Sequence, residues 1–327
     1  MKPDVGPRVR YAAALNAAAG AFMIACAGHV PAQDFPARPL RIVTAEAGGG
    51  SDFSSRIIAQ RMSASLGQQV IVENRPSGVI PGEVVAKAQP NGHTLLLYNN
   101  ILWIGPLIQP APYDPARDFA PVSLVGHTPS MLVVSTALPV RNVSELLGLA
   151  RTRRGELNYA STGSGASNHI AAELFKSMGG VDIVRVNYKG GGIALNAIMA
   201  GEVQMMFTTV VTGTPHVRSG KVRALAVTSA QVSPLAPELP TIAASGLAGF
   251  ESTTATGIFA PARTPSAIVR TLHQSISSGL TLEEVRQKFF AAGMEIVAGG
   301  PDNLREVMRT DLKRVGTIIG RIAIQRD

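Results

Sequence analysis

The chain contains one cysteine, Cys26, and few aromatic or charged residues for its 327 positions. Aromatic residues are 5% and charged residues 16% of the total, and the formal net charge is +8. A nucleic-acid-binding surface combines clustered Lys and Arg with aromatic side chains, and the sequence has no such cluster. We therefore expect no nucleic-acid partner. Positive charge without aromatics fits a protein that attracts small anions.

The N-terminal residues have the pattern of a secretory signal peptide. Three basic residues within the first ten precede a mostly apolar, alanine-rich run over 11–27. Small residues follow at 30–32, where a signal peptidase reads them. We predict a signal peptide over residues 1–32 and cleavage after its last residue.

Cys26 lies inside this leader. Its removal leaves a mature chain with no thiol, which excludes disulfides, cysteine nucleophiles and thiolate metal sites together. One alternative is a lipid attached to Cys26, which Met23 at the first place of the lipoprotein motif disfavours. The other is an uncleaved anchor, disfavoured because about 17 apolar residues are short for a membrane span. No later apolar run approaches the length of a span.

The rest of the sequence is organised around a strand, a glycine loop and a helix. The apolar, β-branched run Leu40–Thr44 predicts a strand, and Gly48–Gly50 predicts a tight turn. Apolar residues then recur mostly every four positions, which predicts a helix over 51–66. We expect Ser51 or Asp52 to cap this helix.

Such a loop presents main-chain N–H groups and the positive end of a helix dipole at one place, which suits an anion. Glycine is favoured there because a Cβ would hold a ligand away from the backbone. The plainer alternative is a turn that binds nothing. The contiguous glycines match neither a P-loop, since no Lys-Ser/Thr follows them, nor the spaced glycines of a dinucleotide fingerprint.

A second copy of this architecture lies in the middle of the chain. The run 157–161 predicts a strand, and 162–168 a loop of glycines and hydroxyl residues that opens a helix. A third glycine turn, Lys189–Gly192, opens another helix. The hydroxyls of the second loop either contact a ligand or only cap the helix that follows.

Strands and helices alternate along most of the chain, which predicts an α/β fold whose mostly parallel sheets are flanked by helices. A chain of this length fits about two domains. We expect one lobe over 33–130 and 256–327, a second over 131–255, and a ligand cleft between them at the carboxyl ends of the strands. Local patterns also predict two strands, 122–125 and 131–135, joined by a turn. They predict an irregular stretch over 99–119 and three C-terminal helices over 266–280, 282–291 and 302–321.

Several blocks, taken in order, resemble one known family. They include Pro39-Leu-Arg-Ile-Val with Ala47-Gly-Gly-Gly-Ser-Asp52, Val70-Ile-Val-Glu-Asn-Arg-Pro76, Tyr159-Ala-Ser-Thr-Gly-Ser-Gly165, Asn187-Tyr-Lys-Gly190 and Gly220-Lys-Val-Arg-Ala-Leu-Ala-Val-Thr-Ser229. Over most of its length the sequence resembles the Bug-type extracytoplasmic solute receptors of tripartite tricarboxylate transporters.

The resemblance implies a two-lobed periplasmic-binding fold of type II that closes on a small carboxylated solute. It implies that main-chain N–H groups and ordered waters at Ala47–Asp52 hold the carboxylate, and that 161–167 add hydroxyls and amides. Two departures stand out. Glu46 ends the segment where the family often has Val-Pro-Phe, so it either accepts a substrate amine or faces solvent. Thr208-Thr209 follow Phe207, where the family commonly has an acidic residue, and the missing acid weakens the case for an amino acid as the ligand.

The candidate ligand-binding residues lie in the two glycine loops and at two further places, directly after the predicted strand 94–98 and directly after Phe207. They are Glu46, Ala47, Gly48, Gly49, Gly50, Ser51, Asp52, Asn100, Ser161, Thr162, Gly163, Ser164, Ser167, Thr208 and Thr209. Asp52 is expected to be a cap or structural acceptor, because a carboxylate repels an anion. We expect no cofactor, and no pair of histidines has metal-binding spacing.

The resulting hypothesis is a monomeric periplasmic receptor that binds a small organic carboxylate and hands it to membrane permease subunits. One alternative is an exported hydrolase acting on an anionic substrate, with Ser161 or Ser164 as nucleophile. It is disfavoured because Ser164 lacks the spacing of a nucleophile elbow and His169 has the pattern of a helix-surface residue. The other alternative is a periplasmic sensor that reports the ligand to a signalling kinase.

Overall fold

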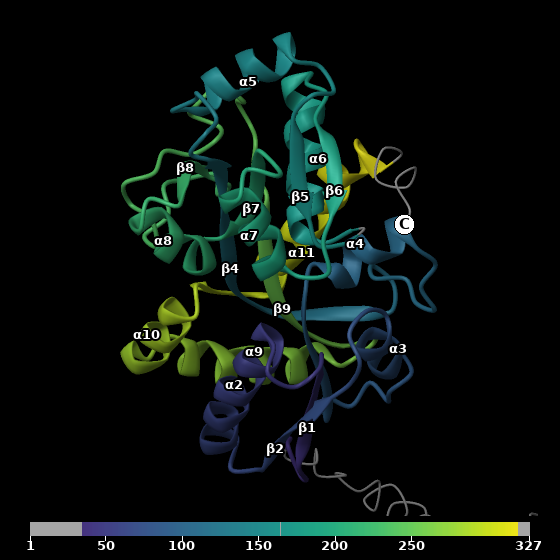
Figure 1. Ribbon diagram of the computed structural model, residues 1–327. Coiled ribbons are helices and arrows are strands. Elements are labelled where there is room, and N and C mark those ends of the chain that lie inside the picture. The colour runs from purple at the N-terminus through teal and green to yellow at the C-terminus, as the bar shows by residue number, and fades with distance from the viewer. Residues whose placement is uncertain (1–34, 164, 320–327) are drawn as a thin grey trace, which may run out of the picture. The chain divides into compact units, whose positions relative to one another are not determined.

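The computed structural model describes residues 35–163 and 165–319 (Figure 1). The predicted signal peptide, Cys26 and Ser164 lie outside the described residues. The strands are β1 (Leu40–Thr44), β2 (Val70–Asn74), β3 (Thr94–Asn99), β4 (Phe119–Ser135), β5 (Asn158–Ser161), β6 (Val184–Asn187), β7 (Met205–Thr209), β8 (Val222–Val227), β9 (Thr253–Pro261) and β10 (Glu295–Gly299). The helices are α2 (Gly50–Leu66), α3 (Ile80–Ala86), α4 (Ile101–Ile108), α5 (Val143–Thr152), α6 (Ser167–Gly179), α7 (Gly191–Met199), α8 (Val210–Arg218), α9 (Ser266–Leu280), α10 (Glu283–Ala291) and α11 (Pro301–Gly316).

The long strand β4 belongs to two sheets. Up to Pro129 it pairs antiparallel with β9 and β10, and from Ser130 it pairs antiparallel with β7 and β8. The first sheet therefore has the order β2-β1-β3-β9-β4, and the second the order β4-β7-β5-β6, with β10 and β8 on the other side of β4. Figure 1 shows β4 passing from one sheet into the other.

Each sheet contains three parallel strands, as the alternation of strands and helices predicted. β1 pairs in parallel with β2 and β3, and β5 with β6 and β7. The strands β4, β8, β9 and β10 add antiparallel pairs that the sequence pattern did not predict. Leu95, Leu96 and Leu97 of β3 are fully buried, as expected for an apolar strand that is covered on both faces.

The two strands predicted over 122–125 and 131–135 are in fact the single strand β4. Gly126 and Pro129 suggest a turn, but the chain stays extended because its two parts pair in different sheets. A glycine is needed at 126 because a Cβ there would lie 2.2 Å from the carbonyl oxygen of Glu295 in β10. Close strand approach, and not a turn, explains this residue.

The stretch 99–119, predicted to be irregular, contains the helix α4 with Pro106 inside it. Leu102, Trp103 and Ile104 of this helix are buried, so packing outweighs the local proline signal. The elements α8 and β10 were also not predicted. The three C-terminal helices are confirmed as α9, α10 and α11.

The helix α2 confirms the opening prediction except at its start. It begins at Gly50 and its N-cap is Gly49, with no capping side chain, so neither Ser51 nor Asp52 is the N-cap. Gly67 ends the helix in the left-handed conformation, with φ of 66°, which a residue without a Cβ adopts at low cost.

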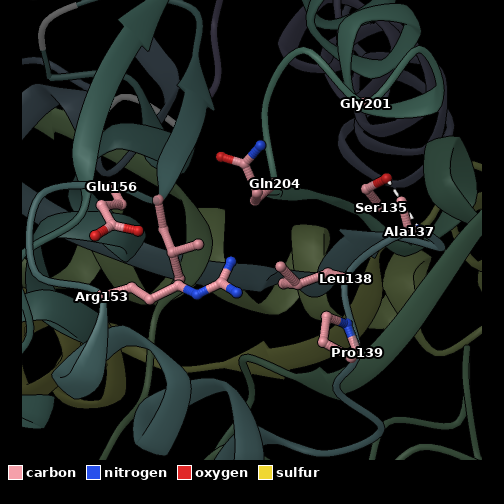
Figure 2. A pocket seen from close by; sticks show the side chains of 9 residues that line it. Ser135, Ala137, Leu138, Pro139, Arg153, Glu156, Gly201 and Gln204 are labelled. Atoms are coloured by element: carbon pink, nitrogen blue, oxygen red, sulfur yellow. Dashed lines mark hydrogen bonds between the residues drawn. The ribbon is translucent and has the colours of Figure 1, made fainter.

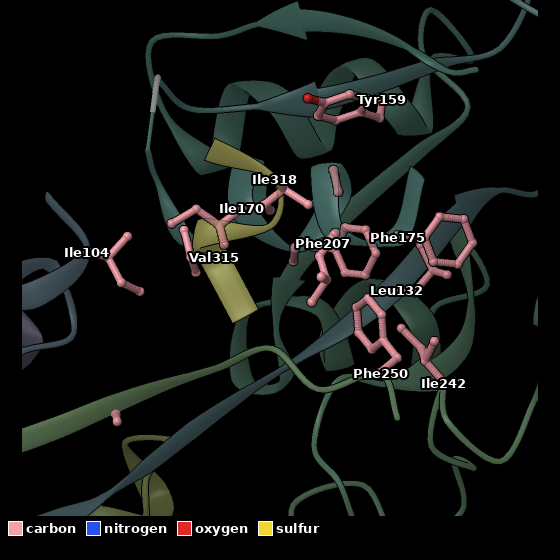
Figure 3. Close-up of a cluster of buried hydrophobic side chains, with 14 of the residues drawn as sticks. Ile104, Leu132, Tyr159, Ile170, Phe175, Phe207, Ile242, Phe250, Val315 and Ile318 are labelled. Carbon is pink, nitrogen blue, oxygen red and sulfur yellow. The ribbon is translucent and has the colours of Figure 1, made fainter. Parts of the chain in front are cut away.

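The C-terminal helix α11 also links the two sheets. It packs against α4 and β4, and its final turn reaches α6, which packs on the second sheet. Figure 3 shows Val315 and Ile318 beside Ile170 of α6, within one hydrophobic cluster that includes residues of both sheets. Among the residues described, no helix combines the length and apolar character that crossing a bilayer requires.

A polar network accompanies this packing. The indole Nε1 of Trp103 donates to Oδ2 of Asp311 over 3.1 Å, and Arg314 donates to the carboxylate of Glu251 over 2.6 Å and to its carbonyl oxygen over 2.9 Å. Burial raises the pKa of Asp311 to about 6, although the Trp103 bond and the charge of Arg314 act against the shift. The network ties α4 and the segment before β9 to one face of α11.

Asp311 makes stability depend on pH. The pKa of Asp311 is about 6 in the folded protein and about 3.9 in the unfolded chain, so the folded protein binds the proton more tightly. The stability that this carboxyl contributes is therefore complete below about pH 4 and is lost as pH rises through 6. We expect Asp311→Asn, which keeps an oxygen for Trp103, to raise the free energy of unfolding at pH 8 by on the order of 1–3 kcal/mol and to change it little at pH 4. Urea unfolding at both pH values measures this. The exposed Asp302→Asn in the same helix is the control, and an equal effect of Asp311→Asn at both pH values contradicts the account.

Candidate functional site

The predicted site residues gather at the carboxyl ends of the parallel strands in both sheets. In the first sheet Thr44 pairs with Asn74, and the loops after them lie side by side. In the second sheet Ser161 pairs with Asn187, and the loops that open α6 and α7 follow. Open α/β sheets bind ligands at such edges.

The two carboxyl edges lie opposite each other along β4. Asn99 of β3 pairs with Thr256, which pairs with Gly126, while Thr209 of β7 pairs with Ser130. The first sheet extends from Gly126 toward the start of β4 and the second from Ser130 toward its end. The two positions are four steps apart along the strand, or about 13 Å at roughly 3.3 Å per residue.

The first glycine loop is anchored by the buried carboxylate of Asp52. This carboxylate accepts bonds from the N–H of Gly48 over 3.0 Å, from Nε of Arg56 over 3.1 Å and from Nδ2 of Asn74 over 2.9 Å. Asn74 also donates to the carbonyl oxygen of Ala45 over 2.8 Å. Burial acts to raise the pKa of Asp52, but these hydrogen bonds outweigh it and lower the pKa. Asp52 is thus a charged structural acceptor, and Asn74, which sequence reasoning missed, links the two loops.

The anchored loop leaves main-chain donors available at the start of α2. The first helical bond runs from the N–H of Phe53 to Gly49, so the N–H groups of Gly50 and Ser51 have no acceptor within the helix. Only Gly48 of the three glycines has a positive φ, of 85°. A Cβ at Gly49 would come no closer than 3.6 Å to another atom, and one at Gly50 would meet nothing within 4 Å. The fold therefore does not require glycine at these two positions.

Glu46 adds a fixed negative charge to this loop. Its exposed carboxylate accepts a hydrogen bond from the hydroxyl of Ser77, in the turn after β2. That bond is the main reason why the pKa of Glu46 lies below its ordinary value. The same turn is held by Tyr98, whose hydroxyl accepts from the N–H of Gly78 over 3.0 Å and donates to its carbonyl oxygen over 3.1 Å.

The second loop repeats the anchoring geometry with different chemistry. The N–H of Gly165 donates to Nδ1 of the buried His169 over 3.1 Å, and the N–H of Thr162 donates to Oδ1 of Asn168 over 3.3 Å. In both loops the third helical residue, Asp52 or His169, accepts from the N–H four positions before it. Because Nδ1 accepts here, the neutral imidazole carries its proton on Nε2. The expectation that His169 lies on a helix surface is wrong, since it is fully buried.

The remaining candidates differ in how much of the side chain is accessible. Ser161 is fully buried and its hydroxyl accepts from Nε of Arg185 over 2.7 Å. Thr208 is also buried, whereas the exposed Thr209 caps α8 by accepting from the N–H of Thr212. Asn100 donates to the carbonyl oxygen of Thr253 over 3.3 Å.

Ala47 and Ser167 are exposed, and Ser51, Thr162 and Gly163 are half-buried. Ser164 lies outside the described residues. The described candidates belong to the two carboxyl edges, but their contact with a ligand stays a prediction.

A separate small cavity of about 220 Å³ lies at the opposite end of the second sheet (Figure 2). Ser135 at the end of β4, Gln204 before β7 and Arg153 after α5 are among the residues that line it. The strands β5 and β7 begin here, so this cavity is at their amino ends and contains none of the candidate residues.

The family comparison decides the identity of the fold. The model of the tripartite tricarboxylate transporter family receptor matches residues 54–324. The chain belongs to this family. Protein BugT of Bordetella pertussis (strain Tohama I) is 33% identical over 299 residues, which cover 90% of this chain and 92% of BugT. The Bug-type resemblance is therefore confirmed.

Two solved structures from the same family of folds contain carboxylates. The structure of R. palustris Rpa4515 with adipate has a TM-score of 0.72 and 32% identity, and covers 89% of this chain and 98% of Rpa4515. MatC (Rpa3494) from Rhodopseudomonas palustris with bound malate has a TM-score of 0.70 and 29% identity, and covers 87% of this chain and 100% of MatC. These likenesses confirm the α/β, two-lobed periplasmic-binding fold predicted from the sequence.

Removing the Asp52 carboxylate tests the anchor of the first loop. Asp52→Ala leaves the N–H of Gly48 and the amide of Asn74 without their acceptor, so we expect the free energy of unfolding to fall by about 1–3 kcal/mol. We also expect faster hydrogen exchange over residues 45–52, measured by mass spectrometry. Asp302→Ala, at an exposed carboxylate in the first turn of α11, should change neither. Unchanged exchange in Asp52→Ala would show that the loop does not depend on this carboxylate.

Proposed function

We propose that this chain is a periplasmic receptor that captures a small carboxylated organic solute and delivers it to the membrane permease subunits of a tripartite tricarboxylate-type transporter. The observation that carries the proposal is the opposition of two anchored glycine loops across residues 126–130 of β4. Each loop follows a parallel strand and opens a helix, so main-chain donors and the positive ends of two helices serve the same gap.

The division into lobes follows from the same strand. We assign 33–130 and 256–327 to one lobe and 131–255 to the other. Two features support this division: β4 changes sheets at Ser130, and the ladder between β9 and β4 begins at Thr253. Solute binding then draws the lobes together about these two strands.

The accessible candidates form the proposed carboxylate seat. On the first edge these are the amides of Ala47 and Gly49–Ser51. On the second they are the hydroxyl of Thr162, the amide of Gly163 and the amide and hydroxyl of Ser167, with Thr209 beside them. Ser161, Thr208, Asn100 and Asp52 support these groups from behind. The adipate and malate bound to the related structures are carboxylates, which supports this class of solute.

Of the two candidate nucleophiles, Ser164 lies outside the described residues, and Ser161 gives catalysis no support. The hydroxyl of Ser161 is fully buried and bonded to Arg185, and Nδ1 of His169 is engaged by Gly165. Within the part of the chain that the structure describes, no three His, Cys, Asp or Glu residues are grouped to hold a metal ion. We therefore propose a receptor without enzymatic activity, and we keep the expectation that it acts as a monomer.

Binding is tested by titrating the purified protein with organic acids in a calorimeter and in thermal unfolding. One saturable site is expected, and a ligand at 100 times its dissociation constant should raise the free energy of unfolding by about 2.7 kcal/mol. A response to no organic acid would refute the proposal.

The seat itself is tested with Gly49→Val. The backbone at Gly49 is extended, with φ of −83° and ψ of 171°, which valine adopts readily. We expect a folded protein whose affinity falls about tenfold or more, because losing one amide bond to a charged ligand costs about 1.5–3 kcal/mol. Gly148→Ala in α5, where a Cβ meets no atom within 4 Å, is the control that keeps full affinity. Unchanged affinity in Gly49→Val would remove the first loop from the site.

A further inference from the structure

Large apolar side chains are exposed where helices begin at the carboxyl edges. Ile80 is the first residue of α3 and Ile101 the first of α4, and they are 39% and 38% exposed. Ile193, the third residue of α7 in the second sheet, is 56% exposed. A single exposed isoleucine is ordinary on a protein surface. Here the same feature recurs after β2, β3 and β6, beside the proposed seat.

A solute with several carboxylates would need cations at the first edge that are available to pair with it, and the charged side chains there do not provide them. The cations there are engaged by carboxylates: Arg56 pairs with Asp52, and Arg75 pairs with Glu73. The charge presented at the loop is the carboxylate of Glu46, which Ser77 holds in place. A second carboxylate on a solute seated at the first loop would therefore meet a negative charge.

The second edge offers little compensation. Arg185 lies behind the loop, where it donates to Ser161 and to Asn187. Lys189 is exposed in the turn before α7. Among the described residues of the two edges, the exposed cation Lys189 thus stands against the exposed anion Glu46, which suits a solute that carries a single carboxylate.

We propose that the solute is a monocarboxylate with an apolar alkyl or aromatic body. Its carboxylate takes the main-chain N–H groups of the seat, its body contacts the first-turn isoleucines Ile101 and Ile193, and Glu46 excludes a second carboxylate. This inference rests on the proposed function and adds a solute class to it.

The decisive comparison uses acids with the same six-carbon chain. Hexanoate carries one carboxylate, adipate carries two, and norleucine carries one carboxylate and an ammonium group. Calorimetric titration of the purified protein should show hexanoate binding at least tenfold more tightly than adipate or norleucine, with malate weaker still. Tighter or equal binding of adipate or malate overturns the inference, and so does tighter binding of norleucine, since Glu46 would then recognise an ammonium group. If none of these four acids binds, the inference fails, whereas the proposed function fails only if no organic acid binds.

Two sets of variants assign the selectivity to the named residues. Glu46→Gln should improve adipate binding severalfold and leave hexanoate within about twofold. Ile101→Ser and Ile193→Ser should each weaken hexanoate about fivefold, because each buried CH₂ is worth about a factor of four in affinity, and should leave acetate unchanged. Ile71→Ser, at an exposed isoleucine inside strand β2, is the matched control and should change neither acid. Thermal unfolding confirms that each variant is folded. An equal loss for acetate and hexanoate, or an unaltered adipate affinity in Glu46→Gln, contradicts the assignment.

Discussion

The constraint on which the rest of this structure depends is that one continuous strand serves two sheets. Main-chain donors and acceptors must stay paired where β4 leaves one ladder and enters the other, because an unpaired buried group costs about as much as a lost hydrogen bond. Pro129, which has no N–H to pair, precedes the change. At Ser130 the hydroxyl of Thr228 accepts the N–H over 2.9 Å, and the N–H of Thr228 donates to the Ser130 carbonyl oxygen over 2.8 Å. A side chain thus completes the pairing at the crossing, and the two carboxyl edges are held opposite each other.

The two glycine loops show how the same geometry is reached with different residues. In the first loop the acceptor is a carboxylate whose charge is stabilised by Arg56 and Asn74. In the second it is the imidazole of His169, which accepts only while Nδ1 carries no proton. Both residues fix the N–H of a glycine with positive φ, Gly48 or Gly165. Each anchoring side chain therefore accepts one N–H group within the loop. The main-chain N–H groups that follow it are not needed to hold the loop in place.

The parts of the fold that could be predicted from the sequence are those decided by local patterns. The unit from Leu40 to Gly67 has a β-branched run, glycines and a periodic apolar stripe, and it was predicted almost residue by residue. The strand β4 was missed because Gly126 and Pro129 are turn signals, and only pairing with two sheets overrides them. The helix α4 was missed because Pro106 interrupts its pattern, and burial of Trp103 among distant residues compensates.

The positions of the two loops of the candidate site could be predicted from the sequence, but the contacts between their side chains could not. Glycines and hydroxyls mark the two loops in the sequence, yet nothing local shows that Ser161 points into the protein or that Asn74 reaches Ala45. These facts depend on the register between neighbouring strands, which brings Arg185 beside Tyr159 and Asn74 beside Thr44. Asparagine at the last position of a strand was the available signal, and it occurs at Asn74 and again at Asn187.

The helix α11 limits how the molecule can move. Two strands alone would let the lobes swing and twist with little resistance. The helix starts on the first sheet, ends with Val315 beside Ile170 of α6, and bonds Glu251 through Arg314 between them. A change in the angle between the two sheets must therefore bend this helix or slide one of its ends over the residues against which it packs.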